Sequence, residues 1–286
     1  MNNEKLPISL CVTVFNEGSN LSEFFGSIER QHFSRIEVVF CDGGSTDDTV
    51  SKLKEYSLTT RHSVRVIESV EKINIAKGRN IAIASSKGAI IAVTDAGCKL
   101  DELWLQNITL PLIEDPNIDV VGGYYYPIIK NSFQRDLAYV ILDSPTAFTS
   151  LNFTPSSRSI CFRKSAWLKV DGYPEHLRLS AEDTLFDILL KKAGCVFWFE
   201  PSAFVWWSMR EDLRSARSIH YSMGYGEGEA GIYGYRYLFY LVCSVFPILL
   251  FLKRRKFRCC WLQYILMLEM LKGWIAAKKQ KMMVYF

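Results

Sequence analysis

The chain has 286 residues, of which 49% are hydrophobic and 22% are charged, and its net charge is +4. This composition suits one sizeable α/β domain with an appendage and excludes a disordered or fibrous chain. The charge is uneven: residues 232–286 carry ten lysines and arginines and one acid, Glu269, whereas the preceding residues carry 24 basic and 29 acidic side chains. A basic segment that is also apolar and aromatic favours an anionic membrane surface over nucleic acid as a partner.

The eight cysteines are scattered, several lie within apolar runs, and none forms a CxxC pair. We therefore predict reduced core residues rather than disulfides or metal ligands. The first five residues are polar and lead directly into an apolar run. We expect no signal peptide and a cytoplasmic body.

In chain order, four short apolar runs alternate with segments of helical spacing. Leu21, Phe24 and Ile28, for example, recur on one helix face. The predicted strands are 9–15, 36–41, 64–68 and 89–94, and the predicted helices are 20–31, 48–56 and 75–85. Buried strands that alternate with helices are typical of an α/β fold with a mostly parallel sheet flanked by helices.

Beyond residue 95 the pattern becomes less regular. A stretch rich in proline, serine and threonine, up to residue 159, is expected to be irregular. Around it we predict helices over 101–113, 164–170 and 180–192 and strands over 119–126, 159–162, 195–199 and 203–207.

The C-terminal part contains two apolar runs separated by a basic cluster, residues 253–258. The first run, residues 237–252, has sixteen uncharged residues, which is short of the roughly 20 that a spanning helix needs. The second, residues 259–277, includes Glu269 and Lys272. We favour a membrane-surface or re-entrant helical pair over a transmembrane hairpin, and a buried hairpin packed on the body is the alternative. The predicted domains are 1–230 and 231–286.

Three acidic residues follow the predicted strands: Glu17, Asp42 and Asp95. The carboxyl ends of parallel strands meet at one edge of a sheet, where ligands of open α/β sheets bind. Carboxylates at such an edge suit metal ions, ribose hydroxyls and the N–H donors of a base. A Rossmann dinucleotide enzyme is disfavoured because no GxGxxG follows the first strand.

Five motifs occur together in one order and spacing. They are Ser9 to Glu17, Val39 to Asp47, Lys77 to Asn80, Val93 to Gly97 and Ala181 to Asp183. In this register the chain resembles the family 2 glycosyltransferases over about residues 7–230. The resemblance implies a GT-A fold, a nucleotide-diphosphate sugar donor, a divalent metal such as Mg²⁺ or Mn²⁺, and sugar transfer with inversion.

The resemblance also implies roles for single residues. Asn16, Glu17, Asp42 and Arg79 would surround the nucleoside, and Asp95 would hold the metal that neutralises the departing diphosphate. Simpler interpretations remain open. Asp42 and Asn16 are also residue types that satisfy turn backbone, and Arg79 is also compatible with a solvated helix face.

Asp183 is predicted to be the general base that takes the proton from the acceptor hydroxyl, because single displacement with inversion needs one base. Glu182 is predicted to bind the acceptor or to support the structure. The segment from Ser180 to Asp183 also fits a helix capping box, and acids in a first helical turn are favourable in any case.

Two positions depart from the family pattern. The metal motif usually has a second carboxylate where this chain has Gly97, and many relatives have a histidine near the position of Trp206. Asp95 with diphosphate oxygens and water still suits Mg²⁺, which needs few protein ligands. We therefore expect a divalent metal.

A further stretch combines arginines and glycines. Arg210, Arg214 and Arg217 are at helical spacing and suit a diphosphate or a lipid phosphate, and a solvated helix face is an equal alternative. We interpret the segment from Gly224 to Gly228 as a hinge.

The sequence therefore predicts a glycosyltransferase on the cytoplasmic face of the membrane. Its acceptor would be lipid-linked or a polysaccharide. A catalytically weak protein that binds nucleotide sugars or organises the membrane is the alternative.

Overall fold

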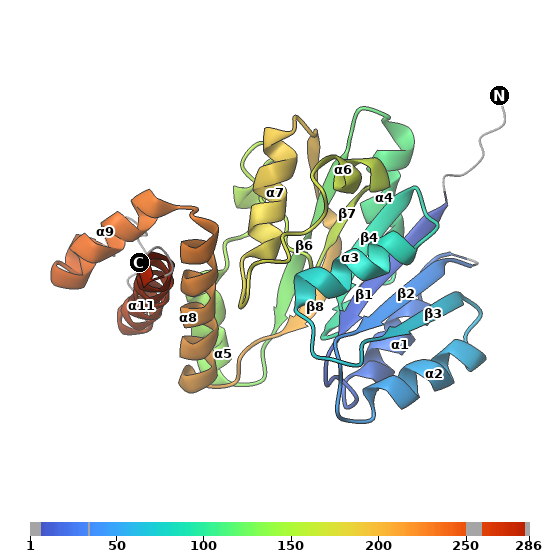
Figure 1. The fold of residues 1–286 in the computed structure, drawn as a ribbon, viewed down its shortest axis with the longest axis horizontal. Helices are drawn as coiled ribbons and strands as arrows, with labels where there is room; N and C mark the ends of the chain where they lie inside the picture. The colour runs from blue at the N-terminus through green and yellow to red at the C-terminus, as the bar shows by residue number, and fades with distance from the viewer. Residues whose placement is uncertain (1–6, 34, 250–258, 284–286) are drawn as a thin grey trace. The chain divides into compact units, whose positions relative to one another are not determined.

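The computed structural model describes residues 7–33, 35–249 and 259–283 (Figure 1). The packing divides the chain into two compact units. The first comprises residues 1–126, 144–175 and 186–208, and it holds the sheet. The second comprises residues 127–143, 176–185 and 209–286, and it is mainly helical.

The first unit is built on an eight-stranded sheet in the order β3-β2-β1-β4-β7-β6-β8-β5. The strands are β1 (Ile8–Val14), β2 (Glu37–Asp42), β3 (Ser63–Glu68), β4 (Ile90–Asp95), β5 (Cys98–Leu100), β6 (Val120–Ile128), β7 (Ile160–Arg163) and β8 (Phe197–Ser208). The pairings among β1, β2, β3 and β4 are parallel, which confirms the alternating pattern of the first 95 residues. The pairings of β7 with β4 and β6, and of β5 with β8, are antiparallel, so the sheet as a whole is mixed.

Helices cover both faces of this sheet (Figure 1). They are α1 (Leu21–Glu29), α2 (Thr49–Thr59), α3 (Ile75–Ser85), α4 (Trp104–Glu114), α6 (Lys164–Lys169) and the part of α7 (Glu182–Lys192) from residue 186 onward. Successive strand residues point to opposite faces, so Leu10 and Val12 pack with α1, α2 and α4, whereas Cys11 packs with α3, α6 and α7. The central strands β1, β2 and β4 read as continuous apolar runs because both of their faces are buried.

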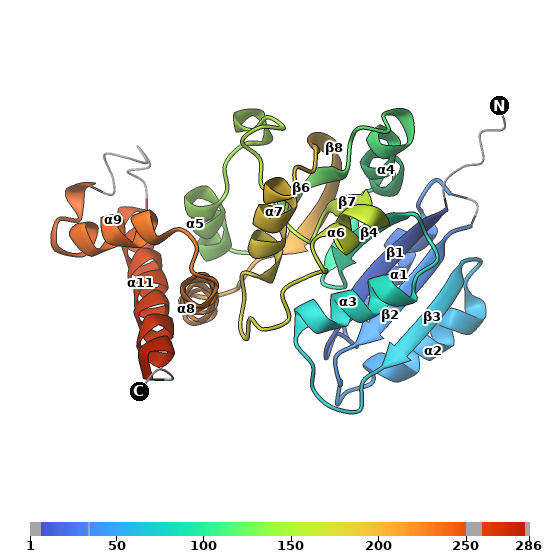
Figure 2. The same cartoon turned by 45° about the horizontal axis from the view of Figure 1, so that its top comes forward.

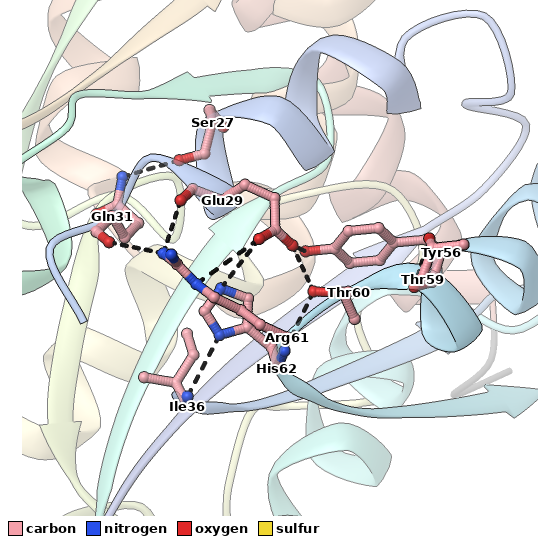
Figure 3. A network of polar contacts seen from close by, with 9 residues as sticks. All are labelled: Ser27, Glu29, Gln31, Ile36, Tyr56, Thr59, Thr60, Arg61 and His62. Carbon is pink, nitrogen blue, oxygen red and sulfur yellow. Dashed lines mark hydrogen bonds and ion pairs between the residues drawn. The ribbon is translucent and has the colours of Figure 1, made fainter. Parts of the chain in front are cut away.

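A polar network ties the end of α1 to the connection between α2 and β3 (Figure 3). The carboxylate of Glu29 accepts hydrogen bonds from the hydroxyls of Tyr56, at 2.8 Å, and Thr60. Arg61 donates to the Glu29 carbonyl at 2.7 Å, and the His62 ring is buried beside the carboxylate. Burial acts to raise the pKa of Glu29, but the two hydrogen bonds and the neighbouring His62 and Arg61 hold it below its usual value.

The second unit is centred on two helices packed side by side, α8 (Leu213–Ala230) and α11 (Cys260–Met283), as Figures 1 and 2 both show. Glycines allow this close approach. A Cβ at Gly224 would lie 1.9 Å from the Met270 carbonyl oxygen, and one at Gly273 would lie 2.1 Å from the Tyr221 carbonyl oxygen. Residues 224–228 therefore lie inside a helix, and the interpretation of this segment as a hinge is wrong.

The second unit also contains α5 (Ser132–Ile141) and α9 (Gly234–Val245). Tyr237, Tyr240 and Cys243 of α9 pack against methionines and Leu271 of α11. No helix in residues 7–33, 35–249 and 259–283 is long and apolar enough to cross a membrane. The end of the predicted run 237–252 and the basic cluster 253–258 lie outside the described residues.

Several element predictions were wrong. The expected irregular stretch contains α5, which a capping box starts: the Asn131 side chain accepts from the Gln134 backbone N–H, and the Gln134 side chain accepts from the Asn131 backbone N–H. The predicted strands 195–199 and 203–207 are one long strand, β8, and the short strand β5 was not predicted. The eight cysteines are free and mostly buried, as predicted.

Candidate active site

The carboxyl ends of β1, β2 and β4 form one edge of the sheet. Asp42 at the end of β2 is paired with Val14 of β1, and Asp95 at the end of β4 is paired with Thr13 of β1. The two acids therefore flank the end of β1 at nearly the same level. The strand-end argument from the sequence placed them together for the correct reason.

Asp42 is buried in the loop that follows β2. One carboxylate oxygen accepts from the backbone N–H groups of Gly44 and Ser45, both at 2.9 Å, and the other accepts from the Ser45 hydroxyl at 2.5 Å. Asp42 thus does satisfy the backbone of the turn, as the simpler interpretation expected. A role of this carboxylate toward a nucleoside stays a prediction.

Asn16 joins the loop after β1 to the loop after β2. Its side-chain oxygen accepts from the Thr46 backbone N–H at 2.8 Å, and its own backbone is left-handed, with φ of 53°. Asp47 strengthens the same junction by accepting from the N–H groups of Gly18 and Thr49. The hydrogen bonds from Thr49 lower the pKa of Asp47. The two loops therefore form one cross-braced surface above the strand ends.

Arg79 projects from α3 to the end of β4. Its Nη2 lies 2.9 Å from Oδ1 of Asp95, and its side chain is only 3% exposed. The guanidinium also lies 5.3 Å from the centre of the Tyr173 ring. The alternative that Arg79 is a solvated helix residue is wrong, because the helix face that carries it packs on the sheet.

Glu17 faces the turn between β4 and β5. One of its carboxylate oxygens accepts from the Asn20 amide at 2.7 Å. The other lies 3.8 Å from the position that a Cβ on Gly97 would occupy, and among the described residues no other atom lies within 4 Å of that position apart from the immediate chain neighbours. Gly97 therefore borders open space, with an acid opposite it.

Trp206 is on β8, which pairs with β5. The register places Trp206 opposite Lys99 and Trp207 opposite Cys98. The Trp206 ring lies 5.5 Å from the Tyr126 ring, so it is part of an aromatic surface rather than a metal ligand. Burial raises the pKa of the Cys98 thiol to about 12, which keeps this neighbouring group protonated at neutral pH.

These residues suit a cation shared with a substrate rather than one held by the protein alone. In the described parts of the chain, no three histidine, cysteine or acidic side chains gather closely enough to hold a metal ion. Asp95 presents one carboxylate, and one of its oxygens already pairs with Arg79. Mg²⁺ in phosphate-handling sites uses one or two carboxylates with phosphate oxygens and water, which this arrangement can provide.

Glu182 and Asp183 lie in the first turn of α7 and belong to the second unit. Asp183 accepts from the Thr184 backbone N–H at 2.7 Å. Ala181, immediately before them, has φ of 72°, in the left-handed region that residues other than glycine seldom adopt. The expectation that Asp183 faces the strand ends of the first unit stays a prediction.

The structure places the three arginines in different positions relative to α8. Arg210 precedes the helix, so the prediction that it shares a helical face with Arg214 and Arg217 is wrong. Arg217 pairs with Glu269 of α11 at 2.8 Å. A cavity of about 580 Å³ is lined by Leu213, Arg214, Arg217, Ser218, Tyr221 and Glu269.

One residue at the sheet edge lies outside the sequence motifs and was missed by the sequence analysis. Arg158, just before β7, has its guanidinium packed against the rings of both Tyr125 and Trp207. A single arginine in a serine-rich turn has no diagnostic spacing. The antiparallel pairing of β7 with β4, which brings it to this edge, was not predicted either.

Fold and site together define an α/β protein of the GT-A type, with acids at the ends of its parallel strands. The model of the family described as glycosyl transferase family 2 matches residues 9–173, more than half of the chain. The chain belongs to glycosyltransferase family 2.

Similar proteins include glycosyltransferase AglE of Haloferax volcanii, which is 25% identical over 175 residues, 59% of this chain and 57% of AglE. UDP-Glc:alpha-D-GlcNAc-diphosphoundecaprenol beta-1,3-glucosyltransferase WfgD of Escherichia coli is 25% identical over 128 residues, 44% of this chain and 48% of WfgD. The chain thus spans about half the length of these relatives. The structure of mannosyltransferase PcManGT from Pyrobaculum calidifontis, in complex with GDP-Man and Mn²⁺, has a similar fold. Its TM-score is 0.61 at 17% identity, covering 98% of this chain and 76% of that one.

Proposed function

We propose that this protein is an inverting glycosyltransferase that moves a sugar from a nucleotide-diphosphate donor to an acceptor hydroxyl. One observation carries the proposal: the family match over residues 9–173 includes the sheet edge at which Asp42 and the Arg79–Asp95 pair meet. An edge rich in carboxylates and backed by a buried guanidinium suits a ligand with both hydrogen-bond donors and phosphates.

The nucleoside end of the donor is assigned to the loops after β1 and β2. Asn16, Glu17 and Asp42 would accept hydrogen bonds from the ribose and the base, and Arg79 would hold Asp95 in place beside them. Asp42 keeps acceptor capacity for this role, because a carboxylate offers about four lone-pair directions and three hydrogen bonds already reach it.

The proposed cofactor is a divalent metal, Mg²⁺ or Mn²⁺, with Asp95 as its protein ligand. PcManGT, of similar fold, was determined with GDP-Man and Mn²⁺, which supports the proposal. When bound, such an ion neutralises charge on the departing diphosphate.

Asp183 is proposed as the general base, with Glu182 as an acceptor-binding partner. A base on the side of the sugar opposite the diphosphate would accept the acceptor proton in the single displacement that inverts the anomeric carbon. The strained Ala181 before it supports a positioned role for this turn.

The proposed acceptor is lipid-linked or a polysaccharide, and the proposed location is the cytoplasmic face of the membrane. WfgD is named for a diphosphoundecaprenol acceptor, which supports a lipid-linked substrate class. Contact with the membrane surface is assigned to residues 231–286, whose composition is basic and apolar. Nucleic acid is not proposed as a partner.

The second candidate is a catalytically weak protein that binds nucleotide sugars or organises the membrane. Gly97 and Trp206 favour it, because neither provides the additional metal ligand that many relatives have.

Nucleotide binding and turnover separate the two candidates. The enzyme should be stabilised in a thermal-shift assay by one of the UDP-, GDP-, dTDP- or CMP-sugars with Mg²⁺, and it should release the corresponding nucleotide. Asp183→Asn should reduce transfer by roughly 10²–10⁴-fold and leave nucleotide binding intact. No response to any nucleotide would count against both candidates, and turnover retained in Asp183→Asn would remove Asp183 from the role of base.

A further inference from the structure

We infer that Arg158 is a cationic subsite for the diphosphate of the donor, held in place by the rings of Tyr125 and Trp207. The inference rests on the proposed function. It adds a residue of this chain to the diphosphate end of the site. The subsite lies entirely within the first unit.

The sheet register brings Arg158 to the end of β4. The antiparallel pairing of β4 and β7 ends with Val93 opposite Ile160, so Asp95, two residues after Val93, and Arg158, two residues before Ile160, both lie beyond that last pair at the same end of the two strands. The hydroxyl of Thr94 donates to the Arg158 carbonyl oxygen at 2.8 Å, which fixes the two segments together. Arg158 is therefore attached to the residue that precedes the proposed metal ligand.

The positive charge of Arg158 belongs to the segment that is bonded to the end of β4. The guanidinium therefore contributes positive potential at the edge where a diphosphate beside Asp95 would lie.

Two aromatic rings orient this guanidinium. Its central carbon lies 4.4 Å from the Trp207 ring centre and 5.2 Å from that of Tyr125, and the two rings are nearly perpendicular at 6.0 Å. One terminal nitrogen donates to the Ser156 hydroxyl at 3.1 Å. Contact with the two rings and with Ser156 restricts the side chain and keeps its charge at this position.

This geometry suits a phosphate more than other anions. The planar fork of an arginine binds phosphate oxygens in pairs, and a pre-oriented cation stabilises charge that develops on a leaving group. This edge has Gly97 where the family pattern has a second carboxylate. The protein should therefore hold a cation less strongly, and less negative charge opposes the diphosphate. Arg158 supplies stabilisation that does not depend on a metal.

The test compares ligands with and without phosphates. Arg158→Lys keeps the charge and removes the fork. We expect it to weaken binding of UDP or GDP, whichever the wild type binds, by roughly tenfold or more in isothermal titration calorimetry. Binding of uridine or guanosine should not change, and the loss of diphosphate affinity should persist in EDTA. Arg65→Lys, at an exposed position of the edge strand β3, is the control and should bind like the wild type.

Trp207→Leu provides a second variant that leaves Arg158 itself intact. It should lower diphosphate affinity in the same direction by a smaller factor, because it removes one ring and keeps the charge. Unchanged diphosphate affinity in both variants would overturn the inference. An equal loss for nucleoside and diphosphate would overturn it too, because that pattern indicates a change of pocket shape. A wild type that binds neither UDP nor GDP, nor any other nucleotide of the panel, would instead defeat the proposed function and the inference with it.

Discussion

Gly97 is the residue at which the proposed metal site differs most from a site with two carboxylates. A side chain at this position meets open space, and the nearest group is a carboxylate oxygen of Glu17 at 3.8 Å. Its backbone is outside the left-handed region that only glycine adopts readily. Gly97→Asp should therefore fold normally and add a second carboxylate beside Asp95.

We expect Gly97→Asp to bind Mn²⁺ roughly tenfold or more tightly than the wild type in the presence of donor nucleotide, because cation affinity rises with the number of charged ligands. Calorimetric titration of Mn²⁺ measures this without relying on activity. Gly97→Asn is the matched control, since it has the same size and no charge. Equal Mn²⁺ affinity for the two variants would contradict a cation at this edge, as would full wild-type turnover in excess EDTA.

The sequence located the site residues better than it described their bonds. Strand ends are visible as apolar runs, so Asp42 and Asp95 were placed correctly at one edge. The three hydrogen bonds that Asp42 accepts depend on how the loop closes, and sequence spacing does not contain that information. The burial of Arg79 and the position of Arg158 likewise depend on packing and strand pairing between distant segments.

At the level of elements, the glycines between α8 and α11 lead us to expect that a glycine-to-alanine substitution inside a helix lowers stability instead of raising it. Replacing glycine by alanine inside a helix normally stabilises it by about 0.5–1 kcal/mol. At Gly224 the added Cβ would lie 1.9 Å from the backbone oxygen of Met270, which cannot move without displacing α11. We expect Gly224→Ala to lower the free energy of unfolding of the second unit by about 1–3 kcal/mol, as overpacking does.

Thermal or urea unfolding with a probe in the second unit measures the Gly224→Ala effect. Gly234→Ala, at the first residue of α9, is the control, because in the described part of the chain no atom beyond its chain neighbours and its own helix backbone lies within 4 Å of the added Cβ. Stabilisation of both variants would show that α8 and α11 are not in close contact.

The same helices explain which elements the sequence predicts poorly. Three glycines at alternate positions read as a break when the segment is considered alone, but Gly224 and Gly228 are the surface on which α11 packs, and Gly226 lies against Ser180. The helix α5 was missed because it was grouped with the loop-like residues that follow it, although its own apolar residues are at helical spacing and the capping pair Asn131 and Gln134 was present as a local signal. Alternating strands and helices in the first 95 residues were correct because that periodicity is local.

For the molecule as a whole, the feature that still needs a function is the exposed apolar face of α9. Its inner face packs on α11, whereas Tyr235, Leu238 and Val245 are 76%, 66% and 70% exposed. These residues recur at intervals of three and seven, so they form one apolar stripe along the helix. No described helix can cross a membrane, and a stripe of this kind is typical of a helix that lies in the membrane surface. The membrane role of residues 231–286 remains a prediction, and the stripe on α9 identifies the residues that would contact the membrane.

We therefore expect the double variant Leu238→Gln/Val245→Gln to weaken binding to vesicles that contain anionic phospholipid by roughly tenfold or more. Each of the two substitutions removes an apolar side chain whose burial is worth about 1.5–3 kcal/mol. Co-sedimentation with vesicles measures this, and salt should weaken wild-type binding because the C-terminal part carries nine more positive than negative charges. Leu58→Gln, at a leucine of α2 that is 86% exposed, is the matched control. If the α9 variant and the control bind vesicles equally well, then α9 is not the membrane-contacting element.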